Sequence, residues 1–308
     1  MTERAQVLQP SFVLSFLSGG FAGMIAKTIA APMERVKLLL QTQIANDRVI
    51  RPYRGITDCF IRTLREEGVL SFWRGNGVNI LRYFPTQALN FSFKESLGKR
   101  LITSKKEQAP IRFFAENILT GGLAGSITTL ILYPLDFART RLGVDIGRRH
   151  NEREFKGLFD CMKKILTFDG PLGLYQGFAP ALLGIFIYRG LYFGMYDTGK
   201  ALLFDEKGIS FWTKFAFAQA VVISSETFAY PTDTVKRRLM MQSGKVGKQY
   251  SGWMDCTLKI ARNEGLGAFF TGNLTNVYRS FGSSLCLVLY DVFREAAENH
   301  AAKLTKVF

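Results

Sequence analysis

The sequence predicts an all-α membrane protein in which six transmembrane helices form three tandem two-helix repeats around a pseudo-threefold axis. Two observations carry this prediction. A motif of the form Pro-x-acid-x-x-base occurs three times, at Pro32–Lys37, Pro134–Arg139 and Pro231–Lys236. Long stretches of apolar and small residues precede each copy, and internal repetition on this scale usually decides the architecture.

Two further landmarks follow each proline in the same order. An aromatic-x-Gly-x-x-Asp-Cys segment runs from Tyr53 to Cys59, from Phe155 to Cys161 and from Tyr250 to Cys256. An acid-Gly pair comes next, and a second glycine follows it: Glu67-Gly68 with Gly75, Asp169-Gly170 with Gly177, and Glu264-Gly265 with Gly272. The shared register divides the chain into repeats at residues 1–106, 107–206 and 207–308.

The first long helix of each repeat is expected to end in the proline motif. In the first repeat it covers residues 11–42, a length that suits a tilted transmembrane helix, and Pro32 is expected to kink it. Small residues at 19–23 and again at 121–125 favour close helix packing. The fifth helix departs from this pattern, because residues 218–222 contain no glycine.

A short amphipathic helix and a second apolar helix complete each repeat. The short helix of the first repeat is expected near residues 58–65, and the second apolar helices near 77–98, 179–203 and 274–297. Six membrane helices would leave both termini on the same side. Three equal pairs would close naturally into a barrel.

Composition narrows the class of protein. Hydrophobic residues make up 47% of the 308 residues, while 40 Lys and Arg outnumber 25 Asp and Glu. This combination suggests a nucleic-acid binder or a membrane protein that faces anionic partners. Nucleic-acid binding would rest on the charge alone, and the apolar spans oppose it. No stretch of ~20 residues is free of charge, which favours helices that line a watery cavity. The N-terminus lacks a secretory signal pattern.

Enzymatic chemistry is not expected from this sequence. It contains no phosphate-binding loop of the Gly-x-x-x-x-Gly-Lys-[Ser/Thr] type and only two histidines, His150 and His300. Three cysteines occupy equivalent positions in the three repeats, and Cys286 is additional. Equivalent positions in separate repeats need not lie near one another, so we expect no disulfide, no metal site and no cofactor.

These residues resemble the mitochondrial carrier family over nearly the whole chain, and within it the ADP/ATP carriers. The proline motifs, paired helices and acid-Gly pairs carry the family resemblance. The signature of the ADP/ATP carriers is an Arg-Arg-Arg-Met-Met-Met run, which resembles Lys236-Arg237-Arg238-Leu239-Met240-Met241 here. Similar strings occur at 72–76, 82–91, 133–142 and 192–198.

The resemblance implies two gates. The acid of each proline motif would pair with the base of another repeat, as Glu34–Arg139, Asp136–Lys236 and Asp233–Lys37, with Gln41 as a brace, and this ring would close the matrix side. The opposing cytoplasmic gate would use the outer ends of the even helices: Glu95, Asp197, Lys200, Asp291 and Arg294. Gly98 stands where the first repeat should carry a base.

Basic residues inside apolar stretches indicate an anion-binding cavity. They are Lys27, Arg82, Lys94, Arg189 and Arg279. Isolated cations are costly within a membrane, so several around one cavity would attract phosphates. The alternative, snorkelling to lipid headgroups, suits Lys94 best. We expect Arg82 and Arg279 to be unpaired.

The resemblance also assigns roles within this cavity. Lys27, Arg82 and Arg279 would hold phosphates. Gly184, Ile185 and Tyr188 would form an adenine-facing wall near Arg189, and Asn90 would contact ribose or base. Ordinary helix packing is an equally good explanation for Tyr188.

Free backbone amides at the paired helix starts attract phosphate, and the resemblance implies that cardiolipin binds there between repeats. The resemblance implies sites at Gly55, Gly157 and Gly252 on the short helices, and at Gly75, Gly177 and Gly272 before the even helices, with Arg74 the one basic residue beside them. Turn formation by the glycines is compatible with this role.

The function implied is exchange of ADP for ATP across the mitochondrial inner membrane by alternating access. The protein would act as a monomer, with both termini toward the intermembrane space. The alternatives are a carrier for another anion, or a structural subunit docked to a larger membrane assembly. Glu226 lies within the apolar part of the fifth helix. We expect it to face protein or water and to pair with a cation.

Overall fold

The computed structural model describes residues 10–103, 110–203 and 211–280. Within these ranges it describes the side chains except at residues 10–22, 110, 150, 197–203, 211 and 214. Within these ranges the chain is helical and has no strand. Five long helices are present, and a sixth begins at residue 273 and is described to residue 280. The helices are α1 (Pro10–Thr42), α2 (Ile56–Glu67), α3 (Asn76–Leu101), α4 (Pro110–Val144), α5 (Leu158–Asp169), α6 (Phe178–Leu203), α7 (Phe211–Gln242) and α8 (Trp253–Asn263).

The helix boundaries agree closely with the sequence prediction. The long helices α1, α4 and α7 each contain the proline of the motif in their interior. Each is followed by a short helix, a 3-10 turn and a further helix, and the helix in the third repeat is described only over residues 273–280. The 3-10 turns are η2 (Val69–Trp73), η4 (Pro171–Tyr175) and η5 (Leu266–Phe270), and a fourth, η3 (His150–Glu152), precedes α5.

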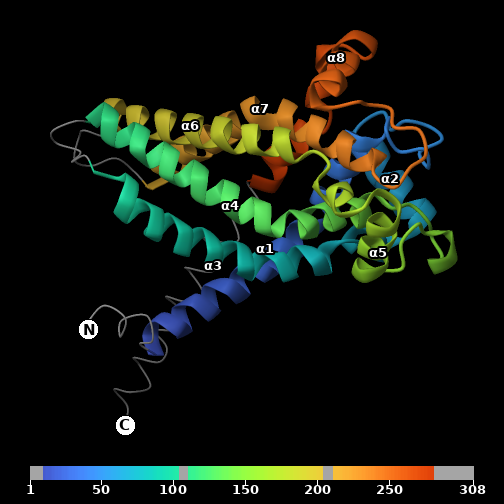
Figure 1. The fold of residues 1–308 in the computed structure, drawn as a ribbon, viewed down its shortest axis with the longest axis horizontal. Coiled ribbons are helices and arrows are strands. Elements are labelled where there is room, and N and C mark those ends of the chain that lie inside the picture. The colour runs from blue at the N-terminus through green and yellow to red at the C-terminus, as the bar shows by residue number, and fades with distance from the viewer. Residues whose placement is uncertain (1–9, 104–109, 204–210, 281–308) are drawn as a thin grey trace.

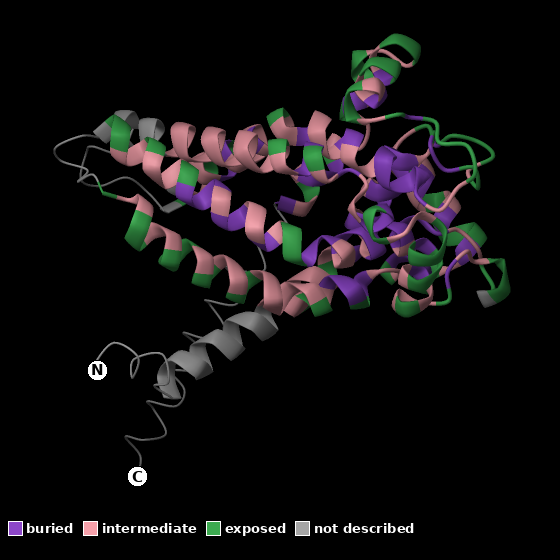
Figure 2. Ribbon diagram, viewed as in Figure 1, coloured by how far each residue is buried: buried purple, intermediate pink, exposed green. Residues whose placement is uncertain are grey.

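The long helices α3, α4, α6 and α7 run side by side, while the first part of α1 diverges from them (Figure 1). The short helices α2, α5 and α8 lie at the end of the molecule where α1, α4 and α7 end, and α8 projects outward there. We call this the short-helix end. Buried residues concentrate there (Figure 2). By length and composition alone, two stretches among the described residues could cross a membrane, Ile111–Val144 and Pro171–Tyr196. Many large apolar side chains on the long helices point outward, as expected for a lipid-facing surface: Ile25, Ile29, Leu81, Phe91, Leu119, Leu130, Leu183 and Phe228.

The aromatic-x-Gly-x-x-Asp-Cys segments build the start of each short helix in the same way. The Asp58 carboxylate accepts a hydrogen bond from the Arg54 backbone N–H at 2.9 Å. Asp160 and Asp255 do the same for Lys156 and Ser251. These carboxylates hold the turn that precedes the helix, which explains why an acid recurs at this position.

The cysteines of the same segments are buried core residues. Cys59, Cys161 and Cys256 are free thiols with no exposed surface. Burial raises the pKa of each thiol to about 12, so they stay protonated at neutral pH.

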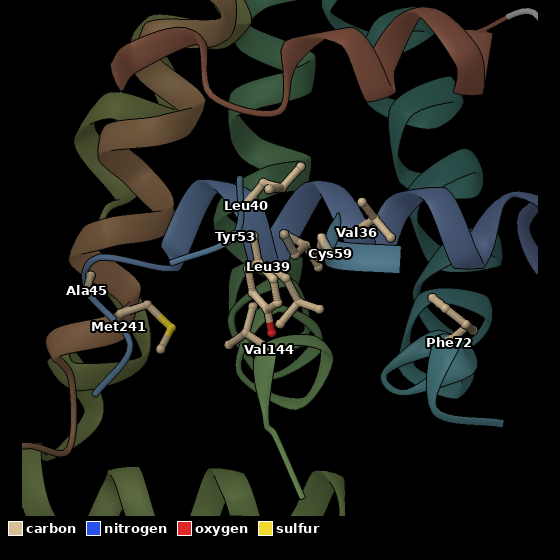
Figure 3. Close-up of a cluster of buried hydrophobic side chains, with 10 residues drawn as sticks. Val36, Leu39, Leu40, Ala45, Tyr53, Cys59, Phe72, Val144 and Met241 are labelled. Carbon is tan, nitrogen blue, oxygen red and sulfur yellow. The ribbon is translucent and has the colours of Figure 1, made fainter. Parts of the chain in front are cut away.

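One cluster at the short-helix end joins all three repeats. Cys59, Leu39 and Phe72 of the first repeat lie in a cluster with Val144 of the second and Met241 of the third (Figure 3). This apolar packing fixes the ends of α1, α4 and α7 relative to one another. The charged motifs on those helices are thereby held in register.

The glycines that precede the even helices permit close contact between repeats. Gly177 has a φ of 81°, a left-handed conformation that favours glycine. A Cβ atom there would lie 2.6 Å from the Lys236 carbonyl oxygen. Gly75 and Gly272 stand in the same relation to the backbones of Arg139 and Lys37. Each glycine therefore packs against the motif base of another repeat.

Candidate functional site

A ring of three ion pairs closes the short-helix end. Lys37 Nζ lies 2.9 Å from Asp233 Oδ2, Arg139 is hydrogen-bonded to Glu34, and Lys236 is hydrogen-bonded to Asp136. Each pair joins two repeats. We call these six residues the ion-pair ring. The three pairings expected from the sequence are confirmed.

Gln41 adds a further link to the ring. Its Nε2 donates a hydrogen bond to Asp233 Oδ2 at 3.2 Å, and the same oxygen accepts the hydrogen bond from Lys37 Nζ. Gln41 is almost completely buried. It therefore braces one of the three pairs, as expected.

A cavity of about 570 Å³ lies directly above the ring. The ring residues Lys37, Asp136, Asp233 and Lys236 line its floor, and it extends along α6 to Phe193. Six basic and three acidic residues line it: Lys37, Arg82, Arg189, Lys236, Arg237 and Arg279 against Asp136, Glu226 and Asp233. The excess of positive charge suits an anion.

Seven of the nine residues expected to bind substrate line this one cavity. They are Arg82, Asn90, Gly184, Ile185, Tyr188, Arg189 and Arg279. Gly184 also permits close helix packing, since a Cβ atom there would lie 2.5 Å from Thr232 Oγ1. Asn276 lines the cavity too, and its buried Oδ1 has no hydrogen-bond partner among the described residues. No repeat pattern pointed to Asn276.

The other two expected residues lie elsewhere. Lys27 Nζ is 3.6 Å from Glu34 Oε1 and so approaches the ring. Lys94 is exposed on α3 and is not among the residues that line the cavity.

The expectation that Arg82 and Arg279 are unpaired is wrong. Arg82 Nη1 lies 3.5 Å from Asp136 Oδ1, and Arg279 Nη2 is hydrogen-bonded to Glu226 Oε1. A buried cation is costly without a counter-charge, and each of these arginines has one nearby. Arg189 differs from them, because no acid among the residues that the structure covers forms an ion pair with it.

Glu226 faces the cavity, and its partner is a cation, as expected from the sequence. It lies on α7, and Arg279 lies on the helix that begins at residue 273. The pair therefore joins two neighbouring helices of the third repeat within the cavity wall.

Comparison with known proteins identifies the family. Residues 8–105, 112–207 and 207–301 each match the family model described as mitochondrial carrier protein. The chain belongs to the mitochondrial carrier family. Carriers of this family are transporters of the mitochondrial inner membrane, and the helical three-repeat architecture described above is consistent with their fold.

Several curated relatives match most of this carrier. ADP/ATP translocase 4 of Bos taurus is 51% identical over 289 residues, which cover 92% of this chain and 89% of the relative. The ADP,ATP carrier protein of Parachlorella kessleri is 51% identical over 291 residues, covering 92% and 85%. ADP/ATP translocase 2 of Rattus norvegicus is 50% identical over 290 residues, covering 92% and 97%.

The run from Lys236 to Met241 divides its side chains between the cavity and the core of the carrier. Lys236 belongs to the ring, and Arg237 lines the cavity 3.3 Å from Asp233. Arg238 points away and pairs with Glu264. Leu239, Met240 and Met241 are buried in three different apolar clusters. The last four residues of the run therefore serve packing between and within repeats.

Buried polar links at the short-helix end of this carrier were not predicted. The Arg35 guanidinium donates to Glu67 at 3.0 Å and to the Gly143 carbonyl at 3.0 Å, which joins the first two repeats. At the next junction, the Asp169 carboxylate accepts from Ser243 Oγ at 2.9 Å and the Gly244 N–H at 2.7 Å. Burial disfavours the Asp169 carboxylate, but the hydrogen bonds from Gly244 and Ser243, together with Lys248, hold its pKa below the usual value.

Arg74 has a different setting from the one expected. Its guanidinium is hydrogen-bonded to the Glu67 carboxylate and to the carbonyls of Asp145 and Gly147. It is therefore engaged inside the protein, and this geometry weighs against a role for Arg74 in binding lipid phosphate.

Only part of the expected outer gate of the carrier is described. Glu95 Oε1 lies 3.0 Å from Lys99 Nζ on the same helix, one turn beyond, and both side chains are exposed. The side chains of Asp197 and Lys200, and all of Asp291 and Arg294, lie outside the described residues.

A groove of about 600 Å³ lies between the first and third repeats of the carrier. It is lined by Gly55 at the start of α2 and by Gly272 before the last helix. Apolar side chains such as Met33 and Leu274 flank these two glycines. The groove therefore combines backbone amides at a helix start with an apolar wall.

Proposed function

We propose that this protein exchanges ADP for ATP across the mitochondrial inner membrane. The observation that carries the proposal is the cavity, in which Arg82, Arg189 and Arg279 come from three different helices and face one space. Phosphates bind such groups through charge-assisted hydrogen bonds. The relatives at about half identity are named as ADP/ATP carriers, which supports adenine nucleotides as the anions.

The mechanism follows from the ring and the cavity. With the ring closed, the cavity ends blindly at Asp136 and Lys236. Exchange requires this ring to open while the opposite end closes. A buried ion pair roughly balances desolvation against attraction, so the three pairs can separate and re-form in each cycle. We infer that the short-helix end faces the matrix and both termini face the intermembrane space.

Nucleotide exchange is tested in proteoliposomes loaded with ADP. We expect uptake of labelled ATP that requires internal ADP. Because ATP carries one more negative charge than ADP, the exchange should respond to membrane potential, by about 2.3 kcal/mol per charge for each 100 mV. Exchange of other anions without nucleotides, or no transport at all, would refute the proposal and favour another anion or a structural role.

The groove between Gly55 and Gly272 supports a second proposal, that cardiolipin binds there. The backbone amides at the start of α2 would hold a phosphate, and the apolar wall would contact acyl chains. Native mass spectrometry should show retained cardiolipin. Replacing Gly55 by Asp, which brings a negative charge to the amides, should reduce it, whereas Glu66→Gln on the exposed face of α2 should not. Equal retention in both variants would contradict this site.

We further propose that the protein functions as a monomer, since the cavity, the ring and the groove are all formed within one chain. Exchange activity that is independent of protein density in the liposome would support this. The protein requires no cofactor in the mechanism proposed here.

A further inference from the structure

The Glu226–Arg279 pair places an acid inside a cavity that otherwise favours anions. Both side chains are largely buried, with 19% and 22% exposed. Only one carboxylate oxygen of Glu226 is used, because Oε2 is buried and has no hydrogen-bond partner among the described residues. Among the described residues, Arg279 alone therefore holds the carboxylate.

Arg279, which binds Glu226, is also a group that a substrate phosphate would bind. Carboxylates and phosphates bind arginine through the same guanidinium donors. A substrate anion that approaches Arg279 must displace Glu226 or lie next to it. In either case the second negative charge opposes binding, since like charges in a site of low dielectric repel strongly.

We propose that Glu226 is a specificity-determining residue that competes with the anionic groups of the substrate for Arg279. It weakens the binding of anions, and it weakens ATP more than ADP because ATP carries the additional charge. The carboxylate thus reduces the preference of the cavity for the more highly charged nucleotide. This inference rests on the proposed exchange of ADP for ATP for the identity of the anion, but not for the competition itself.

The test measures the dissociation constants of ADP, ATP and inorganic triphosphate for the purified protein in lipid. Glu226→Gln should bind ATP and triphosphate at least about tenfold more tightly than the wild type, which corresponds to about 1.4 kcal/mol. The gain should be smaller for ADP. Glu226→Asp keeps the charge and should bind close to the wild type. Glu66→Gln removes an exposed acid outside the cavity and should have no effect.

A double-mutant cycle with Arg279 separates competition from general repulsion. If Glu226 acts by occupying Arg279, the gain from Glu226→Gln should shrink severalfold in an Arg279→Gln background. Glu226→Ala provides a second neutral side chain for the same comparison.

The outcomes are distinguishable. Unchanged affinity in the neutral variants overturns the inference, and so does an equal gain with and without Arg279. Weaker nucleotide binding in Glu226→Gln overturns it as well, because Glu226 would then be a direct ligand, for example for ribose hydroxyls. If the wild type binds triphosphate but no adenine nucleotide, the proposed function fails. Tighter triphosphate binding in Glu226→Gln would still support the competition.

Discussion

Gln41 and Asp233 are 192 residues apart in the chain, yet the Gln41 side-chain amide donates to the Asp233 carboxylate at 3.2 Å. The first repeat therefore holds the third through a neutral hydrogen bond as well as through the Lys37 ion pair. The other two pairs of the ring have no such glutamine among the described residues. The junction between the third and first repeats has this additional constraint.

We expect Gln41→Ala to destabilise the protein with the ring closed by about 1.5–3 kcal/mol, the usual contribution of a hydrogen bond to a charged group. Thermal unfolding in detergent measures this as a lower midpoint. Gln87→Ala, which removes an exposed amide from α3, serves as the control and should leave the midpoint unchanged. Equal midpoints in both variants would show that Gln41 is not a brace.

A charge exchange tests the ring. Asp136→Lys or Lys236→Asp alone places like charges against each other across two repeats and should abolish exchange in proteoliposomes. Combining the two substitutions should restore part of the activity. Restoration is expected to be incomplete, because Asp136 also lies 3.5 Å from Arg82. A double variant no better than the worse single variant would argue against pairing as the function of these residues.

Arg82→Ala should abolish nucleotide exchange with only a modest loss of stability. Arg82 lines the cavity, but Asp136 keeps its partner Lys236 when Arg82 is removed. Lys94→Ala is a control on the same helix, because Lys94 is exposed outside the cavity and should retain exchange. The exchange rates and thermal unfolding midpoints of both variants distinguish a role of Arg82 in transport from a role in stability. Wild-type rates in Arg82→Ala would exclude Arg82 from the site.

Gly177→Ala should destabilise the protein by about 1–3 kcal/mol, the range for a strained backbone conformation. A methyl group at this left-handed position would also contact the Lys236 carbonyl. Gly190→Ala is the matched control, since a Cβ atom there meets nothing within 4 Å and the residue is helical. Thermal unfolding of the two variants should differ clearly, and similar midpoints would contradict the close approach.

The repeat-equivalent cysteines should resist maleimide reagents in the folded protein. Since burial raises the pKa of Cys59, Cys161 and Cys256 to about 12, no thiolate forms near pH 8. Their contribution to stability is complete below the unfolded thiol pKa near 9.0 and is lost as pH rises toward 12. Mass spectrometry of a Cys286→Ser variant should detect no label until a denaturant is added. Rapid labelling of the native protein would contradict this burial.

The ring could be predicted from the sequence, and the buried links around it could not, for one physical reason. Glu34, Asp136 and Asp233 occupy equivalent positions, so any threefold arrangement that brings one pair together brings all three. Arg35 has no such equivalents, because Phe137 and Thr234 stand at its positions in the other repeats. Its contact with Glu67 depends on side-chain direction, which periodicity does not specify.

For the cavity, too, the sequence predicted which residues line it better than it predicted the contacts between their side chains. The placement of cations in apolar helices predicted three residues of the cavity, Arg82, Arg189 and Arg279. The family resemblance supplied four more: Asn90, Gly184, Ile185 and Tyr188. The sequence did not reveal which cation meets which acid. Glu226 was recognisable as an acid at membrane depth, but its neighbour Arg279 lies 53 residues later on another helix. Sequence spacing alone could not distinguish Arg279 from the other arginines.

The Lys37–Asp233 pair joins residues that are 196 positions apart. The helical bundle is incomplete until the third repeat packs against the first, because Lys37 of the first repeat meets this counter-ion only on α7. Contacts over such long sequence separations form late in folding. The formation of this ion pair therefore marks the completion of folding as well as one step of the transport cycle, and a chain truncated before Asp233 would leave Lys37 without this counter-ion.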